Sequence, residues 1–118
     1  MNEYVAVLTT VDNKMEAEGL AKTLVGERLA ACLQIIGPIR STYWWKGTME
    51  TAEEWLCWMK TRTVLYPALE KRLAQLHSYE TPQIVALPIV RGSEQYFAWM
   101  NEVLAQGRPP AEQEGEPG

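Results

Sequence analysis

The residue type that most directly suggests chemistry in this chain is its single histidine, His77. Imidazole nitrogen is a good ligand for copper or zinc, and a cysteine thiolate is a good ligand for Cu(I). Glu80 and Tyr79 are the nearest other ligand types in sequence, whereas dedicated metal sites normally use three or four ligands. One chain therefore predicts no complete site. An assembly could build one from His77, Glu80 and the Cys32 of a second chain.

The alternative role for His77 is structural. It follows a predicted helix, and a cationic side chain at a helix C-terminus interacts favourably with the helix dipole.

Cys32 and Cys57 are the two cysteines, and they lack the CxxC spacing of a redox or zinc motif. If the predicted hairpin turns near Gly47, the two thiols lie about five residues apart along the strands, on the order of 15 Å. A disulfide needs Cα atoms within about 7 Å. We therefore expect free thiols, as is typical of a reducing compartment, with Cys57 acting as a small buried hydrophobe.

Three polar residues could line a pocket between subunits, namely Lys60, Tyr79 and Glu80. The alternative is an ordinary salt bridge between the lysine and the carboxylate. Nucleophilic catalysis has little support, because the lone histidine has no sequence-evident partners. The chain also has no GxGxxG, Walker loop or HExxH motif, so we expect a protein that is not an enzyme.

The elements that position these residues begin with a predicted strand over 4–10, which is apolar and β-branched. Asn13 then opens a helix with Glu16 in capping-box spacing, and Gly26 marks its end. The helix carries a one-sided apolar stripe, made of Ala17, Leu20, Ala21, Leu24 and Val25.

Residues 30–45 form a long extended run that the pair Gly37-Pro38 interrupts. Proline cannot donate to a strand ladder, so this pair predicts a bulge, a bend or an edge position. A turn over 46–48 and a third strand over 54–61 complete a hairpin.

The second half predicts a helix that starts between 64 and 67, a loop over 77–82, and a strand over 84–90. Ser93 can cap a last helix. The two helices have apolar stripes, made of Leu65, Leu69, Leu73 and Leu76 in one, and Tyr96, Phe97, Met100, Val103 and Leu104 in the other. The order β-α-β-β-α-β plus a C-terminal helix predicts an α+β, ferredoxin-like fold with an antiparallel sheet.

Both faces of the predicted strands are apolar, although this topology supplies helices for only one face. In the third strand, Trp55 and Cys57 point one way while Leu56 and Trp58 point the other way. An antiparallel sheet with one wet face should alternate apolar with polar residues. We therefore expect self-association; the alternative is that the last helix or the tail covers the open face.

Composition and charge restrict the class of protein. The 118 residues, 47% hydrophobic and 22% charged, indicate one globular domain over 1–105, and the Pro-, Gly- and Glu-rich segment 106–118 predicts a disordered tail. A net charge of -4 argues against a nucleic-acid partner. No apolar run is long enough for a membrane span, and the N-terminus lacks a signal-peptide pattern, so we expect a cytoplasmic protein.

Several motifs, taken together, resemble the CutA family of divalent-cation tolerance proteins. They are, in chain order, ERLAAC at 27–32, STYWWKG at 41–47, KT at 60–61, HSYETPQI at 77–84 and YFAW at 96–99. Two loop positions differ from the usual family pattern, where Ser78 replaces proline and Gln83 replaces glutamate. The second difference removes one carboxylate that could bind a metal.

The resemblance implies a ferredoxin-like homotrimer in which strands pair between subunits. It also implies a link to tolerance of divalent cations, copper above all, and to metal binding. The trimer is similar to that of the PII signal proteins, which implies a second possible role, small-ligand signalling with no physiological metal. The resemblance implies no established enzyme activity.

Overall fold

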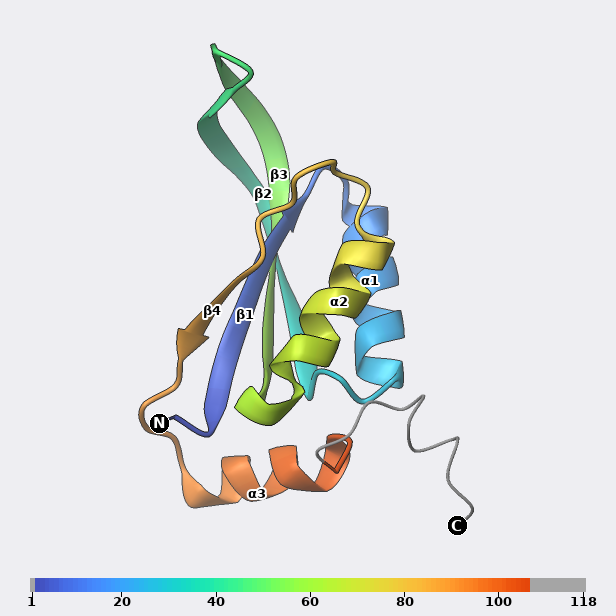
Figure 1. The fold of residues 1–118 in the computed structure, drawn as a ribbon, viewed down its shortest axis with the longest axis vertical. Helices are drawn as coiled ribbons and strands as arrows, with labels where there is room; N and C mark the ends of the chain where they lie inside the picture. Colours follow the sequence, from blue (N-terminus) through green and yellow to red (C-terminus); the bar gives the residue numbers. More distant parts are fainter. Residues whose placement is uncertain (1, 107–118) are drawn as a thin grey trace.

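The fold is a four-stranded antiparallel sheet with two helices packed side by side on one face (Figure 1). The computed structural model describes residues 2–106, and the predicted tail from 107 onward lies outside them. The elements are β1 (Tyr4–Val11), α1 (Lys14–Gly26), β2 (Cys32–Trp45), β3 (Thr48–Arg62), α2 (Tyr66–Leu76), β4 (Val85–Pro88) and α3 (Glu94–Val103). The strand order is β2-β3-β1-β4, which confirms the ferredoxin-like α+β prediction.

The core lies between the sheet and the helices α1 and α2. Strand residues of one parity point into it, and the apolar stripes of both helices meet them, as the sequence periodicity predicts. The buried members are Val5, Val7, Val11, Cys57 and Met59 from the strands, Ala17, Leu20 and Leu24 from α1, Leu29 and Ala30 from the segment after α1, and Leu69 and Leu73 from α2.

The start of α1 is capped as the sequence predicts, but the capping box is only half formed. The Asn13 Oδ1 atom accepts a hydrogen bond from the Glu16 N–H at 2.7 Å. The Glu16 carboxylate does not return to Asn13; it accepts from the Ser78 N–H at 3.1 Å and from the Ser78 hydroxyl at 2.9 Å. The loop after α2 supplies these donors, so Glu16 ties that loop to α1.

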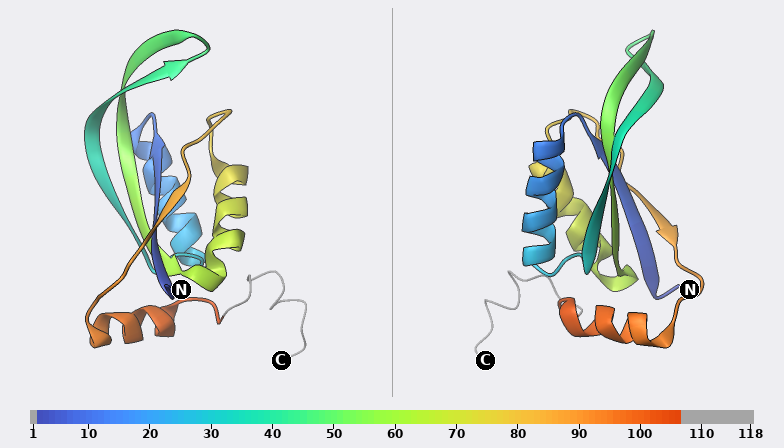
Figure 2. Two further views of the ribbon diagram at one scale, coloured as in Figure 1. Left: turned by 60° about the vertical axis from the view of Figure 1, so that its left-hand side comes forward. Right: turned by 180° about the vertical axis from the view of Figure 1, so that it is seen from behind.

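Strands β2 and β3 form a hairpin arm that extends beyond the rest of the sheet (Figure 2). Its tip is a two-residue turn, in which Lys46 and Gly47 have φ values of 51° and 81°, the positive values that a type I′ turn requires. Because pairing continues to this turn, β3 begins at Thr48 rather than at the predicted Glu54.

The predicted irregularity at Gly37-Pro38 is a register shift between Ile36 and Ile39. A side chain at Gly37 would overlap the indole of Trp55, so this position requires glycine for the close approach of the two strands. Cys32 pairs with Lys60 and Cys57 with Ile35.

At both cysteines, the observed pairing is therefore shifted by two residues from the pairing that a turn centred on Gly47 predicts. The two-residue turn and the bulge cause the difference. Both cysteines are free, which confirms the prediction that they form no disulfide.

The second face of the sheet is only partly covered. Helix α3 crosses one end of it, where Phe97 stacks on Tyr4 with ring centroids 4.0 Å apart. Beyond that end, Val85 and Leu87 of β4 are 42% and 45% exposed. The last helix therefore covers part of the open face, as the alternative proposed, and leaves an apolar remainder. Within residues 2–106 no helix is long and apolar enough to cross a membrane.

Candidate functional site

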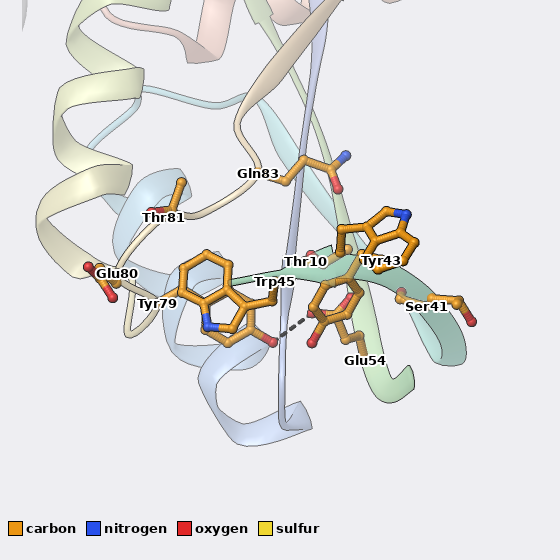
Figure 3. A pocket seen from close by; sticks show the side chains of 11 residues that line it. Thr10, Ser41, Tyr43, Trp45, Glu54, Tyr79, Glu80, Thr81 and Gln83 are labelled. Atoms are coloured by element: carbon orange, nitrogen blue, oxygen red, sulfur yellow. Dashed lines mark hydrogen bonds between the residues drawn. The ribbon is translucent and has the colours of Figure 1, made fainter. Parts of the chain in front are cut away.

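A cavity of about 640 Å³ lies between the hairpin arm and the loop that follows α2 (Figure 3). The arm supplies residues 41–45 from β2 and Glu54 from β3, the loop supplies Tyr79, Glu80, Thr81 and Gln83, and β1 supplies Thr10. The walls are therefore aromatic and hydroxylic, with two carboxylates. Residues far apart in the sequence meet here because the arm extends past the end of β1, beside the loop.

Glu54 is the buried charge of this cavity, with only 5% of the residue exposed. The hydroxyl of Tyr79 donates a hydrogen bond to its Oε2 atom at 2.7 Å (Figure 3). Burial, together with this hydrogen bond and the nearby carboxylate charge, raises the pKa of Tyr79 well above its usual value of 10. The phenol therefore stays protonated and acts as a fixed donor to Glu54.

The rim of the cavity holds an exposed ion pair. The Lys46 Nζ atom lies 3.9 Å from the Glu80 carboxylate and 5.5 Å from the centre of the Trp45 ring. Both charged side chains are more than two-thirds exposed, so the pair adds little stability. It does show that an ammonium group fits over the indole at this position.

His77 is buried at the start of the loop, and both of its ring nitrogens are engaged. Nε2 lies 2.9 Å from the Thr10 carbonyl oxygen and 3.0 Å from the Thr9 hydroxyl, while Nδ1 accepts from the Tyr79 N–H at 3.1 Å. A carbonyl oxygen can only accept, so Nε2 carries the proton. His77 thus fixes Tyr79 beside the cavity. It is the C-cap residue of α2, where the structural alternative placed it, but its Nδ1 accepts a hydrogen bond, so the ring is not the cation that the helix-dipole argument required.

Cys32 and Lys60 form a separate cluster under α3. The Cys32 sulfur lies 3.8 Å from the Lys60 Nζ atom and 3.6 Å from the Tyr96 hydroxyl, and Lys60 also donates to Gln34 at 3.0 Å. Burial, with a further contribution from Cys32, raises the pKa of Tyr96 to about 12.

This cluster and the cavity lie at different places along the sheet. Lys60 pairs with Ala6 on β1, and His77 contacts Thr10, four residues further along the strand, or about 13 Å. One chain thus brings Tyr79 and Glu80 to the cavity, and leaves Lys60 and Cys32 apart from them. Within residues 2–106 no three His, Cys, Asp or Glu side chains gather closely enough to hold a metal ion.

Sequence reasoning missed the central residue of the cavity, Glu54, together with its aromatic walls. One signal was available, because Glu54 has the same strand parity as Leu56 and Trp58. A carboxylate beside two large apolar side chains on one strand face requires a partner if it is buried. Its partner, Tyr79, lies 25 positions away, so spacing alone could not identify it.

Comparisons with known proteins match nearly the whole described chain. The sequence model of a family described as CutA1 divalent ion tolerance protein matches residues 5–103. The divalent-cation tolerance protein CutA of Thermus thermophilus is 44% identical over 96 residues, which are 81% of this chain and 93% of that protein.

Solved structures agree with the sequence comparisons. The crystal structure of CutA1 from Oryza sativa superposes with a TM-score of 0.86 at 36% identity, covering 89% of this chain and 96% of that one. The structure of the periplasmic divalent cation tolerance protein CutA from Archaeoglobus fulgidus superposes with a TM-score of 0.82 at 37% identity, covering 85% and 97%.

Proposed function

Because this chain belongs to the CutA1 divalent ion tolerance protein family, we propose that it acts in divalent-cation tolerance as a homotrimer that binds Cu(II) or another divalent cation. The family match across residues 5–103 is the observation that supports the tolerance function. The trimer and the metal rest on the separate arguments below.

The uncovered sheet face supports self-association. Val85 and Leu87 expose more than two-fifths of their surface on a four-residue edge strand. Ile36, on β2 at the opposite edge of the sheet, is 49% exposed. Apolar strand edges of this kind pair with other chains unless they are covered. A closed ring of three copies would bury them without leaving a free edge.

Metal binding requires more than one chain. His77 has both ring nitrogens engaged, so the three ligand candidates in one chain do not fit a resident ion. The proposal therefore assigns the metal to contacts between chains. Glu80 is exposed and Cys32 is half-buried, and both could contribute. His77 could join them only by giving up a present hydrogen bond.

The proposal assigns no catalysed reaction to the chain, and it places the protein in the cytoplasm. The reducing conditions of that compartment suit two free thiols. Fractionation of the source cells tests this location, because some relatives are named chloroplastic or periplasmic.

Native mass spectrometry with and without a slight excess of Cu(II) tests this proposal. We expect a species of about 40 kDa, three times the 13.4 kDa chain, that takes up whole numbers of copper ions. A trimer without copper would contradict the metal assignment. A monomer would contradict the assembly.

The second candidate is a small-ligand signalling trimer of PII type that has no physiological metal. The cavity beneath the hairpin arm favours it, because a volume of about 640 Å³ lies within the range of small-molecule sites. Thermal stabilisation by a small molecule in the presence of EDTA, with no effect of Cu(II), would favour this candidate over the first.

A further inference from the structure

We propose that the cavity between the hairpin arm and the loop binds a small organic cation, a primary alkylammonium, whose charged group pairs with Glu54 among the rings of Tyr43, Trp45 and Tyr79. This site goes beyond divalent-cation tolerance. It is formed by one chain, so it requires neither the trimer nor a bound metal.

The first argument is the unbalanced charge of Glu54. A carboxylate that is 95% buried is costly unless a cation or several donors compensate it. The lining contains no lysine, arginine or histidine, and none of the three ion pairs within residues 2–106 involves Glu54. The protonated Tyr79 hydroxyl is its one hydrogen-bond donor there. A ligand ammonium would supply the missing positive charge.

The second argument is the aromatic lining. The rings of Tyr43, Trp45 and Tyr79 line the same cavity as Glu54 (Figure 3). The faces of such rings attract cations, and most strongly where water is excluded. The Lys46 ammonium, 5.5 Å from the centre of the Trp45 ring, already shows this contact at the rim. Among residues 2–106, no ammonium or guanidinium group lines the interior position beside Glu54.

The third argument distinguishes an organic cation from a bare metal ion. Aromatic rings offer no ligand atom to a divalent metal, which prefers oxygen, nitrogen or sulfur donors. Thr10 and Ser41 line the same space, and a hydroxyl group can accept an N–H bond from a primary ammonium. An alkyl chain can lie against the exposed indole of Trp44.

The test is a titration of the full-length chain in EDTA with n-butylammonium, followed through the indole N–H resonances of Trp44 and Trp45. We expect saturable shifts of these two signals, and binding of the neutral analogue n-butanol that is at least about tenfold weaker. Equal binding of the two molecules, or no saturable shift with n-butylammonium, would overturn the proposal.

Variants locate the charge. Glu54→Gln keeps the shape of the side chain and removes its charge, and it should weaken n-butylammonium binding by at least about tenfold. The matched control is Glu53→Gln, an exposed neighbour on the same strand, which should leave the affinity unchanged. If Glu54→Gln fails to fold, Trp45→Leu keeps the carboxylate and removes a ring, and it should also weaken binding.

Wild-type affinity in the folded Glu54→Gln or Trp45→Leu variant would show that the cation binds elsewhere. The titration measures neither oligomeric mass nor copper binding. The proposals of a trimer and of a bound metal can therefore be refuted without affecting this site, and the reverse also holds.

Discussion

The two faces of the sheet are built from alternate residues of the same strands, yet they have different environments. On the face covered by α1 and α2, Val7, Cys57 and Met59 are 0% exposed. On the other face, Val85 and Leu87 are exposed by more than two-fifths. The first face closes the core of the single chain. The second presents apolar surface for which this chain has no further element within residues 2–106.

The difference between the two faces shows that the number of apolar residues in a strand does not by itself indicate how much they stabilise the chain. An apolar side chain stabilises the fold only in proportion to the surface that it removes from water. Leu73 and Leu87 are chemically identical, but α2 packs the first against the sheet, whereas the elements within residues 2–106 leave the second 45% exposed.

The largest effect is expected from the covered face. Leu73→Ala removes a side chain that is 0% exposed, and it should lower the free energy of unfolding by about 2–5 kcal/mol because it leaves a cavity. Urea denaturation measures the change. The control is Met15→Ala on α1, where the side chain is 80% exposed and the change should stay within about 0.5 kcal/mol. Equal losses in the two variants would contradict the assignment of the core.

A smaller effect on the same face should appear in alkaline solution. Burial, with a lesser contribution from Glu16, raises the pKa of Cys57 from 9.0 to about 11. Below pH 9 both states keep the thiol proton, so the group contributes no pH dependence. Between pH 9 and about 11 only the unfolded state releases that proton, so stability falls as pH rises.

The measurement compares unfolding free energies of the wild type and Cys57→Val across this range. The wild type should lose stability more steeply than the variant, because the other titrating groups are shared. Parallel curves would contradict the assignment of a desolvated thiol.

A substitution on the open face should have the smallest effect on the unfolding free energy of the single chain. It should, however, disrupt assembly. Leu87→Lys places a charge on a position that is already 45% exposed in one chain, so the unfolding free energy of the isolated chain should change by no more than about 0.5 kcal/mol. The proposed trimer should dissociate, since a lysine would be buried at its interface without a partner.

Native mass spectrometry and sedimentation velocity distinguish these outcomes. Met15→Lys, an equally large change on the outer surface of α1, should remain trimeric. A trimer that tolerates Leu87→Lys would show that this face is not the interface.

Much of the fold was predictable because its signals are local. The stripe of α1, the Asn13 cap and the irregularity at Gly37-Pro38 each depend on a few neighbouring residues, and each is confirmed. The hairpin register was predicted to within two residues, because a turn and a strand period almost determine the pairing.

The candidate site was predictable only in part. Tyr79 and Glu80 were predicted to line a pocket between subunits together with Lys60. They line a cavity of the single chain that does not include Lys60, and Glu54 was missed. The sequence does not show which of the many polar residues will face one another, because that depends on where the hairpin arm and the loop come to lie.

The sequence by itself determined the order of the elements, the family and the absence of a disulfide, since these follow from periodicity, motifs and spacing. Only the tertiary structure decided that Glu54 meets Tyr79 across 25 positions and that His77 meets Thr10 across 67. Contacts of this kind depend on the packing of the whole sheet against its helices, in which many weak interactions together select one arrangement. No short segment of the chain contains that information.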